Sequence, residues 1–234
     1  MPDPSTRDAR PTPLDETRTT RFADRRDAGR RLARALGGLA GTPDLLVLGL
    51  ARGGVPVAFE VARALHAELD VLVVRKLGVP GQPELAMGAI GAGGVTELNP
   101  EVVAAAGVDA AVLHQVAQRE QRELQRREQA YRGEREPPRL RERTVIVVDD
   151  GIATGASMRA ALGVLRRARP ARMLVAVPVA PRDAAYTLGV APAEFVALLQ
   201  PHDFGSVGRF YDDFGQTEDD EVRGLLTRAR ATGA

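Results

Sequence analysis

The chain has 234 residues, of which 44% are hydrophobic and 27% charged, a composition that fits a globular protein with one sizeable α/β domain or two small ones. Its net charge of +1 gives no argument for nucleic-acid or membrane partners, and the absence of cysteine excludes disulfides and thiolate metal sites. No apolar leader and no stretch of 18 apolar residues is present, so we expect no membrane span and a cytoplasmic location.

The N-terminal region divides into a polar tail and a helix. Residues 1–20 are rich in Pro, Asp, Arg and Thr and predict a disordered tail, which leaves a single domain over residues 21–234. Leucine and alanine recur at helical spacing within residues 22–39. The arginines of this predicted helix are expected to form a solvated face: Arg25, Arg26, Arg30 and Arg31.

A strand, a glycine loop and a helix follow in close succession. Residues 45–50 form an apolar run typical of a buried strand, and residues 55–65 have helical spacing. The loop between them contains Ala51, Arg52 and Gly53. Loop N–H groups together with a guanidinium can bind an anion at the end of a strand, and the arrangement suits a pyrophosphate.

A second basic pair precedes a glycine-rich segment. Arg75 and Lys76 end a short apolar run, and Lys76 is the only lysine in the chain. A compact ammonium whose pKa can shift does what arginine cannot, so Lys76 is a candidate for a special role. Residues 77–99 predict a mobile lid hairpin that carries Glu84, with a static β-hairpin as the alternative. Its possible strands lie near residues 85–90 and 95–98.

A long charged helix is predicted after the lid. Asn99 followed by proline is typical of a capped helix start, and residues 109–132 then form one helix with dense Arg and Glu. Because the charges alternate in sign, the pattern favours a solvated helix or a contact in a homodimer over RNA binding.

The most informative stretch is residues 145–157. Four β-branched residues predict a strand buried on both faces, and they are followed by Asp149, Asp150, a loop of small residues and a helix. Backbone N–H groups at a helix start can bind a phosphate, whereas two carboxylates would repel one. The carboxylates would suit sugar hydroxyls or Mg²⁺, so the sequence predicts a phosphorylated sugar as ligand.

This stretch resembles the 5-phosphoribosyl-1-pyrophosphate (PRPP) signature of type I phosphoribosyltransferases: four apolar residues, two acids and a loop ending in Thr-Gly-x-Ser. The resemblance implies that Asp149 and Asp150 contact the ribose, and that Mg²⁺ is held through PRPP with these two acids as candidate ligands. It implies a 5′-phosphate loop formed by Ala153, Thr154, Gly155, Ala156 and Ser157. It implies a pyrophosphate site formed by Ala51, Arg52, Gly53, Arg75 and Lys76.

Beyond the signature, two more buried strands are predicted over residues 172–177 and 194–199, with a short helix between them. Residues 200–230 are expected to form a small C-terminal hood that ends in a capped helix. Four aromatic rings gather in the hood, where a ring can stack on a planar base or pack in the core. The candidate base-binding residues are Val179, Phe210 and Tyr211.

Strands that alternate with helices predict an α/β fold with a doubly wound, mostly parallel sheet. The resemblance to type I phosphoribosyltransferases implies the strand order 3-2-1-4-5. It also implies transfer of ribose 5-phosphate from PRPP to a nitrogenous base with release of pyrophosphate. Lys76, Arg52 and Glu84 are the candidate catalytic residues.

Two departures from the family pattern bear on the identity of the acceptor base. Enzymes for 6-oxopurines carry an acid where this chain has Ala153, and a lysine near residues 177–180, where it has none. The sequence therefore disfavours a 6-oxopurine acceptor, and the resemblance extends to bacterial phosphoribosyltransferase-like proteins of unassigned acceptor. The alternative is a regulatory protein that keeps the fold and senses PRPP or a nucleotide.

Overall fold

The computed structural model describes residues 21–91 and 94–231, without the side chains of Pro83 and Glu84. The predicted disordered tail lies outside these residues. The helices are α1 (Arg25–Ala35), α2 (Gly54–Leu65), α3 (Pro100–Ala105), α4 (Ala110–Arg132), α5 (Ala156–Arg167), α6 (Ala184–Thr187) and α7 (Asp219–Ala231), with short 3₁₀ turns η1 (Gly37–Leu39), η3 (Pro192–Glu194) and η4 (Val207–Phe210). The strands are β1 (Leu45–Leu50), β2 (Glu68–Leu72), β3 (Val74–Val79), β4 (Gln82–Gly91), β5 (Val95–Leu98), β6 (Thr144–Val148), β7 (Arg172–Val179) and β8 (Phe195–Leu199).

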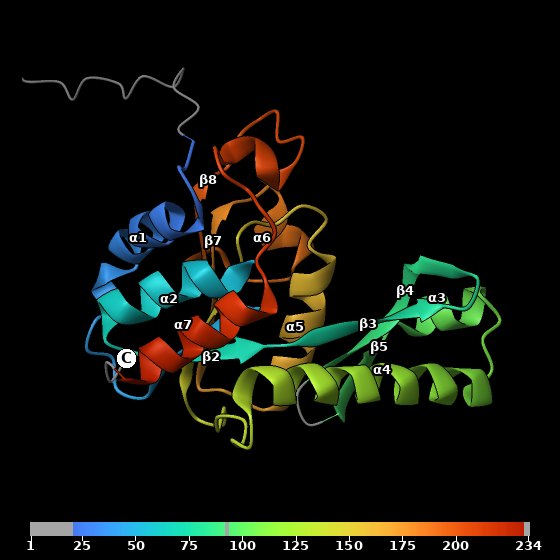
Figure 1. Ribbon diagram of the computed structural model, residues 1–234. Helices are drawn as coiled ribbons and strands as arrows, with labels where there is room; N and C mark the ends of the chain where they lie inside the picture. Colours follow the sequence, from blue (N-terminus) through green and yellow to red (C-terminus); the bar gives the residue numbers. More distant parts are fainter. Residues whose placement is uncertain (1–20, 92–93, 232–234) are drawn as a thin grey trace, which may run out of the picture.

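The body is built on a five-stranded sheet in which every neighbouring pair is parallel (Figure 1). Alternate residues of each strand face opposite sides, so an apolar run fills both faces. In β1, Leu45 and Val47 belong to one core cluster, and Leu46 and Leu48 belong to the other. The predicted doubly wound α/β fold is confirmed.

Helices cover both faces of this sheet. On one side α1 packs on α2, and α2 packs on β1 and α7. On the other side Met158, Leu162 and Leu165 of α5 share a cluster with Leu46 and Leu48 of β1. No helix within the described residues is long and apolar enough to cross a membrane.

The strand order differs from the expected 3-2-1-4-5. The observed order is β2-β1-β6-β7-β8, which is 2-1-3-4-5 when the five strands are counted along the chain. The chain leaves the sheet after β2, forms β3 to β5 and α4, and returns as β6 on the other side of β1. The first strand thus lies beside the edge strand, and the order reverses between β1 and β6. Open α/β sheets bind ligands at such a reversal.

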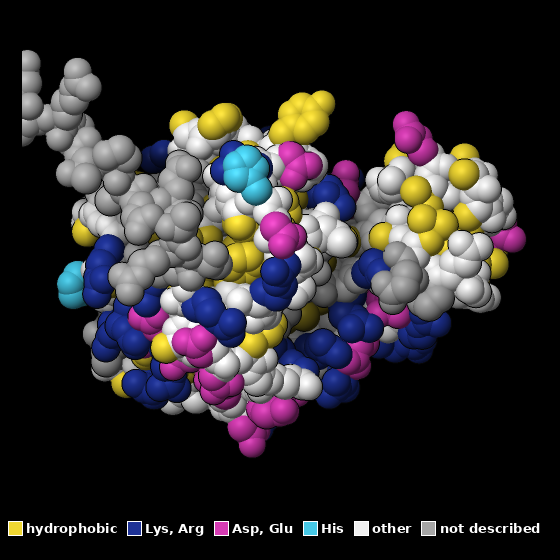
Figure 2. Space-filling model, turned by 90° about the horizontal axis from the view of Figure 1, so that it is seen from above, with side chains coloured by type: hydrophobic (Ala, Val, Ile, Leu, Met, Phe, Trp, Pro, Cys, Tyr) yellow, Lys and Arg dark blue, Asp and Glu magenta, His cyan; other side chains and the backbone are white. Residues whose placement is uncertain are grey.

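The predicted lid lies within a second, antiparallel sheet of order β3-β4-β5. The strands expected near residues 85–90 and 95–98 are present as β4 and β5. Leu77, Met87 and Ile90 are buried in the same cluster as Val116 of α4, so this sheet packs firmly on that helix. Figure 2 shows it as a smaller lobe beside the body, with apolar side chains gathered on it. Mobility of the lid stays a prediction.

The C-terminal segment divides into two parts. Residues 200–217 follow β8 and contain η4, and Tyr211 among them donates to the Asp150 carbonyl oxygen after β6. In contrast, α7 packs on α2 and β2 (Figure 1), and Val222 and Leu226 are buried in the main core cluster. The helix at the end of the predicted hood therefore belongs to the body.

Two helical glycines predict opposite effects of the same substitution. A Cβ on Gly29 of α1 would lie 2.8 Å from the Val57 carbonyl oxygen of α2, whereas one on Gly224 of α7 would meet nothing within 4 Å. We expect Gly29→Ala to lower the free energy of unfolding by about 1–3 kcal/mol through overpacking. Gly224→Ala should raise it by about 0.5–1 kcal/mol through helix propensity. Urea unfolding of both variants measures this, and equal effects would contradict the close α1–α2 packing.

Candidate PRPP site

The loops after β1 and β6 meet at the reversal of strand order. A Cβ on Gly53 would clash directly with Asp150 Oδ2, and one on Gly54 would lie 2.5 Å from the Val148 carbonyl oxygen. Any side chain at either position would displace the acidic pair or the end of β6. The glycines are thus required because the predicted pyrophosphate loop and the predicted ribose carboxylates are in direct contact.

The two carboxylates are held in a poorly hydrated corner. Burial, followed by repulsion from Asp150, raises the pKa of Asp149 well above its usual value. Burial also raises the pKa of Asp150, although the Arg25 guanidinium partly opposes that shift. The Asp150 backbone N–H donates to Asp149 Oδ1 at 2.9 Å, and Tyr211 Oη donates to the Asp150 carbonyl oxygen at 2.6 Å. Two adjacent carboxylates in this setting would gain from a nearby cation.

Arg25 supplies part of that positive charge. Its Nε donates to Asp150 Oδ2 at 2.8 Å, and its Nη1 donates to the Gly215 carbonyl oxygen at 2.6 Å. The guanidinium also lies 4.1 Å from the centre of the Phe214 ring. The side chain of Arg25 is only 13% exposed, so the prediction that this arginine lies on a solvated face is wrong. The helix places its first turn at the site, which its periodicity could not indicate.

The predicted 5′-phosphate loop is at the start of α5. Gly155 is the N-terminal cap with φ of 72°, a conformation that favours glycine, and Thr154, Ala156 and Ser157 are exposed. Backbone N–H groups at this helix start can therefore face a ligand. Arg159 was not predicted, yet its Nη1 lies 3.2 Å from the position of a Cβ on Gly155. An arginine one turn into a helix after such a loop is the signal that could have indicated it.

The backbone of Arg52 lies in the site, whereas its side chain points to the start of the C-terminal helix. Its backbone belongs to the loop beside Asp150, and the peptide bond between Ala51 and Arg52 is cis. Its guanidinium, however, lies 3.8 Å from Glu218 Oε2 and 3.7 Å from Asp219 Oδ1. In the described state the side chain is therefore oriented by the start of α7.

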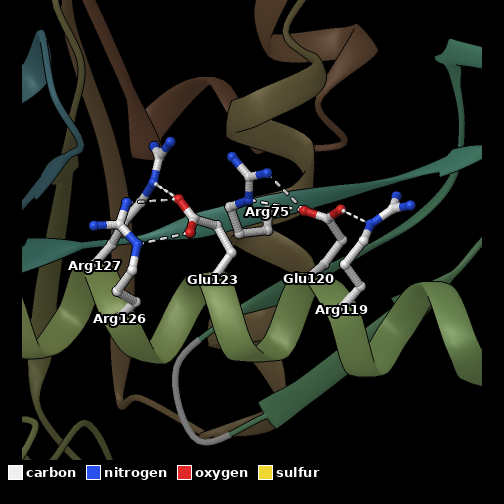
Figure 3. Close-up of polar contacts among 6 residues, drawn as sticks. All are labelled: Arg75, Arg119, Glu120, Glu123, Arg126 and Arg127. Atoms are coloured by element: carbon white, nitrogen blue, oxygen red, sulfur yellow. Dashed lines mark hydrogen bonds and ion pairs between the residues drawn. The ribbon is translucent and has the colours of Figure 1, made fainter.

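The basic pair on β3 is separated by the pleat of the strand. Arg75 Nη2 and Nε donate to Glu120 Oε2 of α4 at 2.6 and 3.0 Å (Figure 3). Lys76 is exposed on the other face of the strand, since successive strand residues point to opposite faces. The backbone of Glu84 lies in β4, and its side chain is outside the described residues. The structure therefore separates Arg75 from Lys76.

The candidate base-binding residues lie in the core. Val179, Phe210 and Tyr211 are buried in one cluster, so they present no surface to a ligand in the described state. Phe214 is the hood aromatic that is 37% exposed, although one face of its ring is covered by Arg25. The sequence does not show which of the four hood aromatics are buried and which are exposed, because all four have similar neighbours along the chain.

The acidic pair can accommodate a divalent cation only in a particular way. Within the described residues no group of three or more His, Asp or Glu side chains gathers to hold a metal. Mg²⁺ commonly binds through one or two carboxylates and completes its coordination with water and substrate phosphates. Asp149 and Asp150, with their raised pKa values, fit that mode of binding and do not form a complete protein cage.

Sequence comparison identifies the family. Residues 21–190 match the phosphoribosyl transferase domain, which covers the central sheet through β7 and both loops of the site. The chain therefore belongs to the phosphoribosyl transferase domain family. The predicted family is confirmed.

Individual relatives agree with this membership. The chain is 50% identical over 208 residues to "Putative phosphoribosyl transferase MT0597" of Mycobacterium tuberculosis strain CDC 1551 and, equally, to Rv0571c of strain H37Rv, which has the same description. The match covers 89% of this chain and 47% of theirs, so the chain spans about half the length of these relatives. The crystal structure of TT1426 from Thermus thermophilus is 48% identical with a TM-score of 0.79, and the match covers 89% of this chain and 99% of that one.

Proposed function

We propose that the protein transfers ribose 5-phosphate from PRPP to a nitrogen atom of a base and releases pyrophosphate. The observation that carries this proposal is the contact between the Gly53 loop and Asp150 at the reversal of strand order. In this proposal the Gly53 loop binds pyrophosphate beside the carboxylates that bind ribose, next to the proposed phosphate loop at the start of α5. PRPP has its three charged or hydroxylated parts in the same order.

Each part of PRPP has a proposed partner. The loop of Ala153 to Ser157 binds the 5′-phosphate, Asp149 and Asp150 bind the ribose hydroxyls, and the Ala51–Gly53 backbone with Lys76 binds the pyrophosphate. Bound Mg²⁺ would supply charge neutralisation of the pyrophosphate. The bond from C1′ to pyrophosphate breaks with its electron pair leaving on oxygen, the base nitrogen donates a pair to C1′, and the proton of that nitrogen passes to the departing pyrophosphate.

The protein's own contribution is mainly positioning and electrostatics. The departing pyrophosphate is already a good leaving group, so the chain has to align the base and stabilise a sugar that becomes cationic. The carboxylates of Asp149 and Asp150 favour that positive charge. Glu84 and Arg52 are proposed to complete the site when the lid closes, which would also exclude water.

The proposed acceptor is a base other than a 6-oxopurine. Ala153 leaves the middle of the phosphate loop without an acid, and the end of β7 has no lysine. In addition, the space above Gly151 is filled by Val207 of the hood, since a Cβ there would lie 2.5 Å from Val207 Cγ1. The hood thus approaches the acidic pair with an apolar side chain.

A pyrophosphate-release assay tests the function. The protein is incubated with Mg²⁺, PRPP and one of adenine, uracil, hypoxanthine or guanine, and we expect release that depends on a base and is lower with the two 6-oxopurines. Lys76→Ala should reduce the rate by roughly 100-fold or more. Tyr186→Ala, a change at an exposed residue of α6, should leave the rate unaltered. If PRPP binds in calorimetry and no base promotes release, the protein is a sensor and the transferase proposal fails.

A further inference from the structure

Glu120 differs from the other acids of α4. It is 6% exposed on a helix with a mostly solvated surface, and it accepts from two nitrogens of Arg75 on β3 as well as from Arg119 Nε at 3.0 Å. Glu123, one turn further on, accepts from Arg126 and Arg127, and within the described residues its partners are on its own helix (Figure 3). Glu120 therefore links the smaller sheet to α4, whereas the ion pairs of Glu123 lie within α4.

The pairing of strands shows which face of the smaller sheet each basic residue occupies. Arg75 is opposite Ile90, and Lys76 is opposite Ala89. Ile90 belongs to the cluster that includes Val116 and Leu124 of α4, so Arg75 is on the α4 face. A residue and its direct cross-strand neighbour share a face, so Lys76 and Ala89 are on the other side.

That other side faces α5. Val74 has the same orientation as Lys76 and packs against the cluster that contains Met158 and Leu162 of α5. Its cross-strand partner Gly91 would, with a Cβ, lie 2.7 Å from Val164 of the same helix. Lys76 thus shares its face of the strand with residues that touch α5 near Val164, in the last turns of the helix that begins at the phosphate loop.

We propose that Glu120 is a positioning residue for the reaction. By holding Arg75 against α4, it fixes the register and the rotation of β3, so that Lys76 is directed to the pyrophosphate side of the sheet. Arg75 then acts as the anchor of the lid strand and does not contact pyrophosphate. The inference rests on the proposed function, because it requires Lys76 to bind the pyrophosphate of PRPP.

The surroundings of the pair permit movement once it is broken. A cavity of about 450 Å³ lies beside it, lined by residues of β3, the β3–β4 turn and α4, including Arg75, Lys76, Arg119 and Glu120. Arg75 is 29% exposed, so a charge left without Glu120 could be hydrated there and the fold would be retained. Loss of Glu120 should therefore loosen β3 without unfolding the protein.

The test compares Glu120→Gln with Glu123→Gln as a matched control on the same helix. The dissociation constants of Mg·PRPP and of ribose 5-phosphate are measured by calorimetry for the full chain. Glu120→Gln should weaken PRPP binding roughly 10-fold or more, with ribose 5-phosphate unchanged, because only PRPP reaches Lys76. On a Lys76→Ala background, Glu120→Gln should have no further effect. Hydrogen exchange of residues 74–79 should be faster in Glu120→Gln and unaltered in Glu123→Gln.

Three results would overturn the inference alone: an unchanged PRPP affinity in Glu120→Gln, an equal loss for ribose 5-phosphate, or a full additional loss on the Lys76→Ala background. A wild-type protein that does not bind Mg·PRPP would instead overturn the proposed function and this inference with it. The two failures are therefore distinguishable in the same titrations.

Discussion

Asp149→Asn is expected to stabilise the free protein and, at the same time, to weaken PRPP binding roughly 10- to 100-fold. Burial and the charge of Asp150 raise the pKa of Asp149, which means that its ionised form is unfavourable in the fold. Asparagine removes this charge and keeps an oxygen that can accept from the Asp150 N–H. Each kcal/mol gained should raise the melting temperature of a chain of this size by about 2–4 °C.

The pH dependence follows from the same shift. An acid with a higher pKa in the folded than in the unfolded protein binds more protons when folded, so stability falls as the pH rises from the usual Asp range to the raised pKa. The Asp149→Asn variant should show a smaller fall, because the raised pKa values of Asp150 and Asp70 remain. Thermal unfolding between about pH 4 and 8 measures it, with Asp150→Asn as the comparison. That second change also removes the partner of Arg25, so a gain in stability equal to that of Asp149→Asn would contradict the assignment.

Asp70→Ala is expected to destabilise the protein by about 3 kcal/mol, because it leaves the Arg132 guanidinium buried without its main partner. Arg132 Nε donates to both Asp70 oxygens, at 3.0 and 3.2 Å, and its Nη2 donates to the Val71 carbonyl oxygen at 2.6 Å. This ion pair links the end of α4 to edge strand β2. Burial raises the pKa of Asp70 in spite of Arg132, a sign of how dry the pair is.

The matched control for Asp70→Ala is Asp203→Ala, which removes an exposed pair with Arg209 at 3.3 Å. Such a surface pair contributes about 0–1 kcal/mol. Urea unfolding of both variants measures the two losses of unfolding free energy. The Glu128 carboxylate lies 2.9 Å from Arg132 Nη1, so it still partly compensates the guanidinium when Asp70 is removed. If Asp70→Ala unfolds as readily as the control and no more, Glu128 alone compensates the buried guanidinium.

The elements of the fold could be predicted because they depend on local sequence. The apolar run at residues 45–50 gave β1 with its observed bounds. Asn99 caps α3 by accepting from the Val102 N–H, as its position before proline indicated. The acidic pair and the small-residue loop after β6 could also be predicted, because all residues of the signature lie in one continuous stretch of sequence.

The parts that could not be predicted depend on contacts between distant segments. Arg25 and Asp150 are in different elements, and nothing in the period of a helix selects one arginine out of four for burial. The same holds for Arg75 and Glu120, whose pairing needs the orientation of α4 on the smaller sheet. Strand order was taken from a resemblance and was wrong, because the place where β6 returns depends on the whole excursion through β3 to α4.

The clash that any side chain at position 53 would have with Asp150 has an evolutionary consequence. Positions 53 and 150 are far apart in the sequence, but a side chain at position 53 would need the space that the Asp150 carboxylate fills. A substitution at one position therefore constrains the residue at the other. A homologue that carries a larger residue at the first position must shorten, or rotate away, the acid at the second. The glycine and the acid should therefore be inherited together, and their simultaneous loss would mark the branches in which the chemistry of the domain has been abandoned.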